Sequence, residues 1–175
     1  MTTGAVRPAA PRDADELAEL HVETWRQTYA HLLPPDFFSE AHLDARRDMW
    51  RAALGAEHHD IIRVAEHDSR IVGFAWVGES SEEDRPFAPR QLKALYVDAA
   101  LHGSGVGQRL FDAVRGEGPL VLWVLRDNAR AIAFYERNGF RRDGFERPTR
   151  TISEFVICRM VRAAQPAAPS ERLDQ

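Results

Sequence analysis

The chain has 175 residues, of which 44% are hydrophobic, enough to bury the core of one ordinary domain and too little for two. Its formal net charge is −4, so it lacks the basic footprint of a nucleic-acid-binding protein. Cys158 is the only cysteine, which excludes an internal disulfide and favours a reducing compartment. No run has the length of a membrane span and no signal core opens the chain, so we expect a cytoplasmic protein that acts without a membrane.

Patterns in the first half predict two helices followed by a hairpin. A strand at residues 6–8 leads into a helix that Asp13 and Glu16 open as a capping box, with Asp13 accepting from the first turn and Glu16 reaching back. Prolines at residues 34–35 end this helix, and a second helix ends at Gly55. Two strands then flank a turn-rich stretch and predict a hairpin, at residues 61–65 and 71–77.

Patterns in the second half alternate between strands and helices. A loop over residues 80–89 comes first, and the expected elements after it are strand 92–97, a helix starting near residue 108, strand 121–125, helix 128–138, a strand from residue 140 and a last strand over 151–161. A helical crossover implies parallel pairing and the hairpins imply antiparallel pairing. We therefore expect an α/β fold with a mixed sheet and helices on its faces, in one domain over residues 1–162. Residues 163–175 are expected to form a disordered tail.

The most informative stretch is the loop before the third helix, His102-Gly103-Ser104-Gly105-Val106-Gly107. Glycine occupies three alternate positions, so the loop carries few side chains and several backbone N–H groups can face one anion. The helix that follows adds the positive end of its dipole. The loop therefore predicts a site for a phosphate ester. A Walker A loop needs Lys-Ser/Thr after the last glycine, where Gln108 and Arg109 stand. A dinucleotide fingerprint is a weak match, because its last glycine position holds Gln108.

Two blocks of sequence resemble motifs of one family. The run from Leu92 to Leu110 resembles motif A of the GNAT superfamily, the GCN5-related N-acetyltransferases, which centres on Arg/Gln-x-x-Gly-x-Gly/Ala. The run from Asn128 to Phe140 resembles motif B, Asn-x-x-Ala…Phe-Tyr-x-x-x-Gly-Phe. Both stand in the family order and spacing, and the opening helix resembles that of bacterial small-substrate members. The resemblance implies the GNAT fold, a mostly antiparallel mixed sheet splayed between its fourth and fifth strands, and acetyl-CoA as co-substrate.

The resemblance also implies which residues hold acetyl-CoA. The backbone of Leu95, Tyr96 and Val97 pairs with pantetheine, and an N–H near Leu95 faces the thioester oxygen. The six residues from His102 to Gly107 hold the pyrophosphate, and Asn128 both caps its helix and contacts the coenzyme.

The first position of the loop departs from the family pattern. His102 stands where the motif has Arg or Gln, and His is shorter and mostly neutral near pH 7. Either its side chain contacts the phosphates or the backbone binds them alone. Arg109 and Arg130 are alternative sources of positive charge.

Acetyl transfer needs a general acid and a general base. By resemblance Tyr135 is the acid that protonates the departing thiolate, although its spacing from Ile132 also suits plain core packing. The glutamate that many relatives use as base aligns with Gln91, which cannot take a proton. Glu79 and Glu23 are then the candidate bases.

Other features bear on the base and the acceptor. His21 is a further candidate base, and Trp25 and Tyr29 form either an aromatic wall of the acceptor pocket or ordinary core. The acidic loop at residues 79–84 would suit a cationic acceptor, or is simply solvated. The acceptor is a small-molecule or peptide amine that the sequence leaves open.

Several expectations complete this reading. The histidines at residues 58–59 lack metal-ligand spacing, so no metal is expected, and Cys158 is expected to pack as a small hydrophobe. Homodimers are common in the family. The alternative function is a non-catalytic acyl-CoA-binding or sensory module, which the departures at His102 and Gln91 favour.

Overall fold

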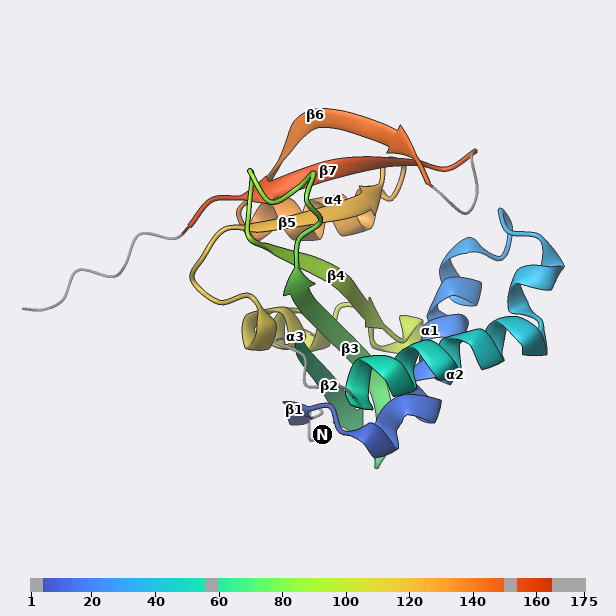
Figure 1. Ribbon diagram of the computed structural model, residues 1–175. Helices are drawn as coiled ribbons and strands as arrows, with labels where there is room; N and C mark the ends of the chain where they lie inside the picture. The colour runs from blue at the N-terminus through green and yellow to red at the C-terminus, as the bar shows by residue number, and fades with distance from the viewer. Residues whose placement is uncertain (1–4, 56–59, 150–153, 165–175) are drawn as a thin grey trace, which may run out of the picture. The chain divides into compact units, whose positions relative to one another are not determined.

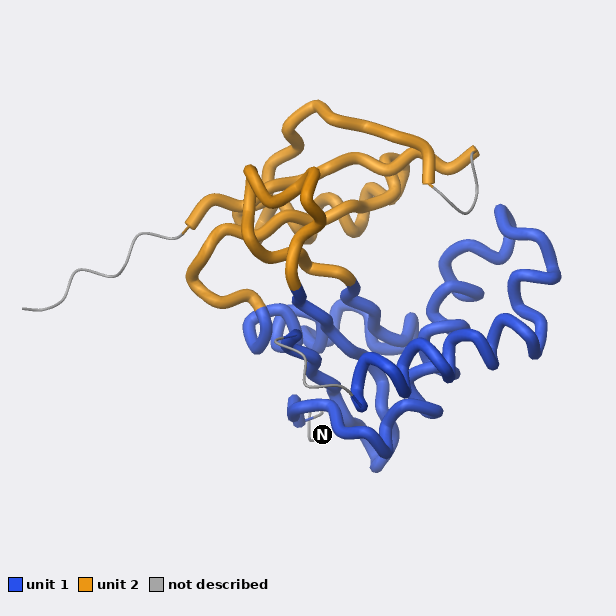
Figure 2. Tube along the Cα trace, in the orientation of Figure 1, with its two compact units in different colours: residues 1–78, 94–114 blue, residues 79–93, 115–175 orange. Residues whose placement is uncertain are grey.

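The computed structural model describes three stretches of the chain: residues 5–55, 60–149 and 154–164. The chain divides into two compact units, coloured separately in Figure 2. The first comprises Met1–Gly78 with Ala94–Val114, and the second Glu79–Lys93 with Arg115–Gln175. All but the first two residues of the predicted tail lie outside the described residues. The single domain over residues 1–162 stays a prediction.

The first unit holds two long helices, a short helix and a run of strands (Figure 1). Its elements are β1 (Ala5–Pro8), α1 (Ala14–Tyr29), α2 (Glu40–Gly55), β2 (Ile61–His67), β3 (Arg70–Glu79, whose last residue begins the second unit), the end of β4 (Arg90–Val97) and α3 (Val106–Val114). Short 3₁₀ helices lie at Pro11–Asp13, Pro35–Phe38 and Ala99–Leu101. β1, β2 and β3 pair antiparallel in that order, which confirms the predicted hairpin. Asp68 and Ser69 close it with φ values of 49° and 62°.

Helices cover both faces of β3 in the first unit. The ring of Phe74 meets the fully buried ring of Trp50 from α2 at 4.9 Å between centroids. The adjacent Gly73 faces the other way, where a Cβ would lie 3.0 Å from Leu110 Cδ1 of α3. α1 and α2 therefore pack on one face and α3 on the other, as Figure 1 shows.

The predicted capping box of α1 is wrong. Asp13 makes no capping hydrogen bond to the helix. Its carboxylate instead accepts from Arg7 Nη1 and from the N–H of Ala10, each at 2.7 Å. Glu16 Oε1 accepts the N–H of Ile71 at 2.7 Å. Both carboxylates thus accept hydrogen bonds from groups outside the helix. These bonds connect the start of α1 to the neighbouring segments.

The other helix predictions hold with shifted ends. α1 ends at Tyr29, before the prolines expected to stop it, and Pro35 opens a 3₁₀ helix instead. α2 ends at Gly55 as expected. α3 begins at Val106, slightly before the expected start.

The second unit combines three strands and a helix with the start of β4. Its elements are β5 (Leu120–Leu125), α4 (Ala129–Arg137), β6 (Phe140–Pro148) and β7 (Val156–Arg162). β4 pairs with β5 in parallel, from Arg90–Leu92 to Leu120–Leu122, whereas β7 pairs antiparallel with both β5 and β6. β4 contributes residues to both units, and the order of the strands in the sheet is β1-β2-β3-β4-β5-β7-β6. The predicted mixed, mostly antiparallel sheet with flanking helices is confirmed.

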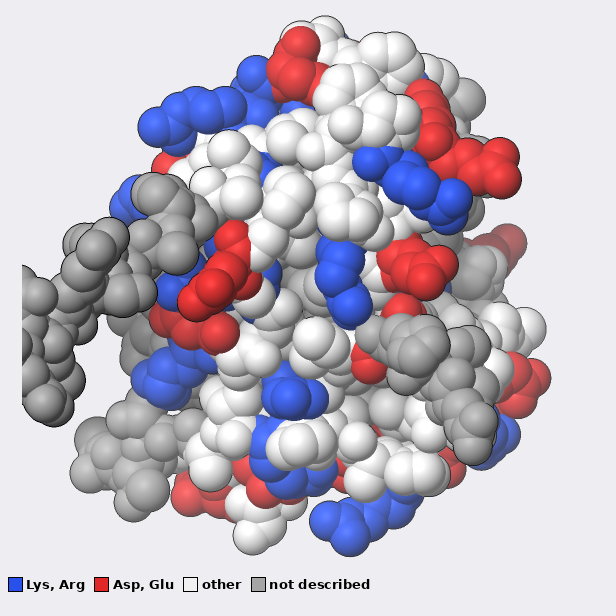
Figure 3. Space-filling view, turned by 60° about the vertical axis from the view of Figure 1, so that its left-hand side comes forward, with Lys and Arg blue, Asp and Glu red and all other residues white. Residues whose placement is uncertain are grey.

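The last strand starts later than expected. β7 begins at Val156 and Glu154 lies in a turn before it, while the predicted start at residue 151 lies outside the described residues. Among the residues described, no helix is both long and apolar enough to cross a bilayer. Figure 3 shows basic and acidic side chains interspersed over the face in view, in keeping with the small net charge.

Candidate active site

The glycine loop leads directly into α3 in the first unit. Gly103 and Gly105 have φ values of +81° and +84°, which lie in the left-handed region that strains other residues. The N–H of Arg109 bonds to the carbonyl oxygen of Gly105 at 3.1 Å. Val106 and Gly107 open α3, and backbone N–H groups at the start of a helix point toward its positive end. The layout suits an anion at the positive end of α3.

Two side chains of the loop bond back to its own backbone. The N–H and Oγ of Ser104 both donate to the carbonyl oxygen of Leu101, at 3.2 and 2.6 Å. Nε2 of His102 lies 3.0 Å from the carbonyl oxygen of Val97. Because a carbonyl only accepts, Nε2 carries the hydrogen. Both side chains therefore stabilise the turn, and their phosphate contacts stay predictions.

The guanidinium of Arg109 lies against the glycine loop. Its Nη1 is 3.4 Å from the position that a Cβ on Gly105 would take. Its Nε and Nη2 are buried, and no group in the described part of the chain accepts from them. Arg130, the other candidate cation, is exposed at the start of α4 in the second unit. Arg109 thus places a positive charge with unused donors beside the loop.

The end of β4 alternates between the two faces of the first unit. Tyr96 packs toward α1, with its ring centroid 5.2 Å from that of His21. Val97 Cγ2 faces α3, 3.7 Å from the position of a Cβ on Gly107. Leu95, Tyr96 and Val97 are all half-buried. The side chains are used in packing, and the backbone roles implied by the resemblance stay predictions.

An aromatic cluster lies where α1 meets the start of α2. Trp25 stacks on Phe37 at 5.3 Å with an interplanar angle of 17°, and meets Tyr29 edge-on at 5.4 Å. All three side chains keep part of their surface exposed. His21 is buried behind them at 7% exposure. Trp25 and Tyr29 are thus brought together as expected, and their role as a pocket wall stays a prediction.

The environment of His21 makes it a poor base. Burial, with a smaller contribution from the nearby charge of Arg46, lowers the pKa of His21 to about 3. The imidazole is therefore neutral at physiological pH, and it cannot hold a proton taken from an amine.

The two candidate carboxylate bases lie in different units. Glu23 is on α1, where its carboxylate bonds to Arg26 and accepts from Gln27 Nε2 at 3.4 Å. Glu79 is the last residue of β3 and is exposed. Gln91, at the position of the family glutamate, pairs with Val121 in the parallel ladder. Neither carboxylate is enclosed, and both base roles stay predictions.

The motif B residues lie on α4 in the second unit. Asn128 Oδ1 accepts the N–H of Ala131 at 3.1 Å, which confirms the predicted N-cap. Tyr135 is half-buried, with its ring edge-on to Phe140 at 5.7 Å between centroids. The ring therefore contributes to packing, and its role as acid stays a prediction.

Two carboxylates of the acidic loop are used inside the second unit. Asp84 is 1% exposed and accepts from Arg159 Nη1 at 3.1 Å and from Trp123 Nε1 at 2.8 Å. Glu83 pairs with Arg147 at 2.6 Å. These two charges stabilise the loop and are not offered to a cationic acceptor.

Neither a metal site nor a reactive thiol emerges from the described residues. Within them, no three His, Cys, Asp or Glu side chains gather as metal ligands, and residues 58–59 lie outside them. Cys158 is 1% exposed, and burial raises the pKa of its thiol. It therefore packs as the small hydrophobe that was expected.

The predicted site residues fall into two groups. The first unit holds the glycine loop, Leu95, Tyr96, Val97, Trp25, Tyr29 and Glu23, and the second holds Asn128, Tyr135 and Glu79. Arg46, which no motif in the sequence pointed to, lies beside the aromatic cluster with its Cζ 5.8 Å from the ring centroid of Trp25. Its position four residues before the buried Trp50 placed it on the inner face of α2 and was the available clue.

Comparisons with known proteins support the family. The family described as "Acetyltransferase (GNAT) domain" matches residues 58–142. An uncharacterized N-acetyltransferase of Mycobacterium tuberculosis (strain H37Rv) is 30% identical over 141 residues, which cover 75% of this chain and 85% of that protein.

Two solved structures share the fold. PaiA N-acetyltransferase from Thermoplasma acidophilum, in complex with coenzyme A, matches with a TM-score of 0.68 at 19% identity over 91% of this chain and 98% of that one. YncA from Salmonella typhimurium, with acetyl-CoA, matches with a TM-score of 0.65 at 20% identity over 97% and 99%. The structures show the fold and the mycobacterial relative shows the family: the chain belongs to the GNAT family of N-acetyltransferases.

Proposed function

We propose that this chain is an acetyl-CoA-dependent N-acetyltransferase that transfers acetyl to a primary amine by direct attack in a ternary complex. The observation that carries the proposal is the glycine loop, in which Gly103 and Gly105 take positive φ directly before α3. Family membership supports it, as do coenzyme A and acetyl-CoA bound to two structures of this fold.

The donors around this loop fit a pyrophosphate. The N–H groups at the start of α3 offer neutral donors, and Arg109 adds a guanidinium whose Nε and Nη2 have no acceptor among the described residues. A guanidinium matches phosphate oxygens in geometry and keeps its charge at every physiological pH. His102 stands where the motif has Arg or Gln. We therefore assign to Arg109 the side-chain contact to the pyrophosphate.

Acetyl-CoA, when bound, supplies the acetyl group as an activated thioester. Leu95 offers its backbone N–H to polarise the thioester carbonyl, in an oxyanion-hole role. Tyr135 holds a proton on its phenolic oxygen for the departing sulfur, and Asn128 contacts the coenzyme from the start of α4. Glu23 or Glu79 takes the proton of the amine, since the low pKa of His21 removes it from that role.

The Tyr135→Phe variant tests this assignment. Removing the phenolic proton should lower kcat by about a hundredfold or more, the usual contribution of a general acid. The affinity for coenzyme A, measured by calorimetry, should stay within about twofold, because a proton on its way to sulfur contributes little to ground-state binding.

Two results would contradict the proposal at different levels. An unchanged kcat would remove Tyr135 from the acid role and leave the activity in place. Coenzyme A binding without thiol release on any amine of a broad panel would favour the non-catalytic acyl-CoA-binding or sensory module.

Three wider expectations belong to the same proposal. The acceptor is a small-molecule or peptide amine, with Trp25 and Tyr29 as the wall of its pocket. The enzyme works in the cytoplasm as one domain over residues 1–162. Pairing into a homodimer follows only from what is common in the family.

A further inference from the structure

Three arginines of α2 differ in how their charge is balanced. Arg47 Nη1 bonds to carboxylates of Glu40 and Asp44, each at 2.9 Å. Arg51 Nη2 bonds to Asp15 at 2.8 Å. Arg46 has no carboxylate within ion-pair distance in the described part of the chain, and Nη1 contacts only the sulfur of Met49, at 3.6 Å. Arg46 is thus the arginine of this helix that lacks an anion.

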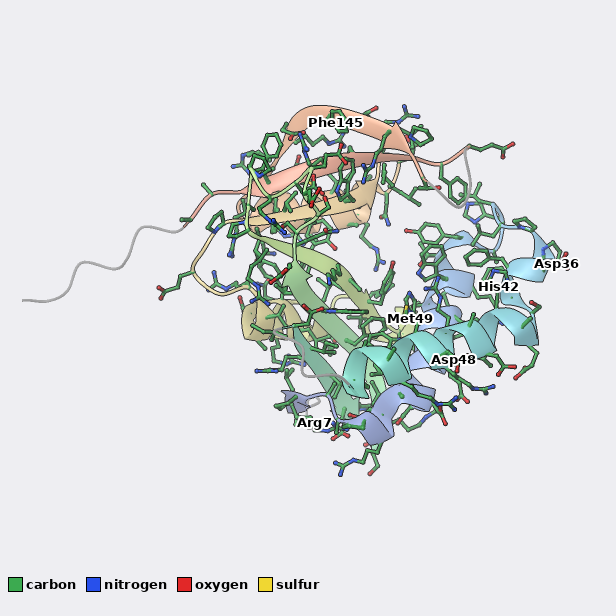
Figure 4. The ribbon with its side chains drawn as sticks, viewed as in Figure 1. Arg7, Asp36, His42, Asp48, Met49 and Phe145 are labelled. Atoms are coloured by element: carbon green, nitrogen blue, oxygen red, sulfur yellow. The ribbon has the colours of Figure 1, made fainter. Side chains whose placement is uncertain are left out.

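Arg46 is also partly removed from solvent. Figure 4 shows Met49, its contact, on one side of α2 and Asp48 on the other. Its side chain is half-buried, and desolvation lowers its pKa from the usual value. A partly desolvated cation is unfavourable until an anion joins it. An anion in contact with the guanidinium would therefore stabilise it, and the described residues provide none.

The surroundings of Arg46 are aromatic and uncharged. Its Cζ lies 5.8 Å from the ring centroid of Trp25, which stacks on Phe37. Phe37 in turn lies 4.8 Å from His42, one turn before Arg46 on α2. His21, the buried basic group of the cluster, is neutral at physiological pH. Arg46 thus offers a positive charge next to an apolar wall, whereas Arg26, whose Cζ lies 5.2 Å from the ring centroid of the adjacent Phe38, is paired with Glu23.

We propose that Arg46 binds the carboxylate of the acceptor, so that the amine acetylated by this enzyme is an amino acid, or a similar amino-carboxylate, with an apolar side chain. The guanidinium donates two parallel N–H bonds to the carboxylate, and Trp25 and Phe37 pack against the apolar side chain. A single charge suits a monoanionic carboxylate better than a phosphate dianion. This inference rests on the proposed acetyl transfer and names its substrate class.

The position of Arg46 also suits an acceptor-binding role. The charge of Arg46 reaches Tyr96, where it partly offsets the burial that raises the pKa of this phenol to about 12, and Tyr96 lies near the end of β4, the strand assigned to acetyl-CoA. A carboxylate held at Arg46 would therefore keep the molecule beside that strand. The acidic loop offers no competing site for a cationic acceptor at Glu83 and Asp84, because arginines pair with both.

The kinetic test compares acids with their neutral amides. Acetyl-CoA-dependent thiol release is measured with L-leucine, L-methionine and L-phenylalanine, and with the three corresponding amino-acid amides. We expect kcat/KM for at least one free acid to exceed that for its amide by about tenfold or more, the size expected for a charge-assisted hydrogen bond. In Arg46→Met this preference should vanish, through a raised KM for the acid and an unchanged value for the amide.

Arg51→Met is the matched control. Arg51 lies on the same helix and is exposed, with its partners Asp15 and Asp48 also at the surface. The variant removes one positive charge from α2 without touching the aromatic cluster, so the preference for acids should persist.

A binding measurement separates this inference from the proposed function. Calorimetry with the N-acetyl forms of the same amino acids needs no turnover; binding that Arg46→Met abolishes and Arg51→Met retains would support the assignment. Amides acetylated as efficiently as acids, or a stronger preference for phosphoethanolamine, would overturn the inference while acetyl transfer stands. If no amine is acetylated although coenzyme A binds, the proposed function fails, and the inferred substrate class fails with it.

Discussion

The Nε2 atom of His102 lies 3.0 Å from the carbonyl oxygen of Val97, so the first side chain of the glycine loop folds back onto the preceding strand. The guanidinium of Arg109 lies on the loop instead, beside Gly105. We therefore expect the positive charge at this loop to come from Arg109, one turn into the helix, and not from His102.

Substitutions at the loop should separate the contributions of His102 and Arg109 to acetyl-CoA binding. His102→Ala should weaken acetyl-CoA binding by less than about tenfold, because its ring bonds to the chain itself. Arg109→Gln should weaken it by about tenfold or more, since a charge-assisted bond to phosphate is lost. Arg137→Gln, at an exposed arginine of α4, serves as the control, with affinities measured by calorimetry. A larger loss for His102→Ala than for Arg109→Gln would reverse this assignment.

The conformation of Gly105 should matter for both binding and stability. Its φ of +84° would strain an alanine, at a cost of about 1–2 kcal/mol. Gly105→Ala should therefore lower the free energy of unfolding by this amount and weaken coenzyme A binding. Gly55→Ala is the control, because a Cβ there meets nothing within 4 Å. Equal behaviour of the two variants would show that the left-handed turn is not needed.

The buried carboxylate of Asp84 should stabilise the fold. Asp84→Ala leaves Arg159, itself 6% exposed, with Asp143 as its remaining carboxylate partner, and removes the acceptor of Trp123 Nε1. Breaking such a buried pair costs about 3–5 kcal/mol. Glu83→Ala breaks an exposed pair with Arg147 and should cost at most about 1 kcal/mol. Urea unfolding of both variants checks the contrast, and similar losses would mean that Asp84 is not the stabilising member of the loop.

Stability at acid pH should depend on Asp13. Its pKa is lowered, chiefly by the hydrogen bonds from Arg7 and despite burial, from the ordinary value of 3.8. The unfolded chain therefore binds a proton at this position before the folded chain does. The stabilisation is fully present above pH 3.8 and is lost as the pH falls through the lowered pKa.

The Asp13→Asn variant isolates this effect. It should cost about 1–3 kcal/mol near neutral pH, the range for a hydrogen-bonded charged group that is nearly buried. Its unfolding free energy should approach that of the unmodified chain as the pH falls below 3.8. Asp44→Asn, at an exposed carboxylate, is the control, and a difference that does not shrink with acid would contradict the sign.

Local patterns were enough to predict the elements that position the site. The hairpin of β2 and β3, the strand–loop–helix around the glycine loop and the N-cap at Asn128 all depend on residues close in sequence. The capping box at Asp13 and Glu16 failed because more distant partners, Arg7 and the N–H of Ile71, took the carboxylates. Such competition is invisible in the local pattern.

Features set by tertiary packing were equally hidden. Gly73 sits in a plain strand pattern, yet a Cβ there would lie 3.0 Å from both Leu110 Cδ1 and the carbonyl oxygen of Tyr96. Arg46 and Arg47 are neighbours in sequence, yet Arg47 pairs with Glu40 and Asp44 of its own helix, whereas no carboxylate among the described residues lies within ion-pair distance of Arg46. The role of Asp84 likewise required knowing that Arg159 reaches it from β7.

The most direct test of the central claim follows the acetyl group itself. The protein is incubated with acetyl-CoA carrying an isotopic label in the acetyl group and with a broad panel of amines that includes the apolar amino acids, and the products are identified by mass spectrometry. The account predicts labelled N-acetyl amino acid formed in step with free coenzyme A, and strongly reduced formation in Tyr135→Phe. Label that stays on coenzyme A with every amine, while calorimetry shows the coenzyme bound, would contradict it.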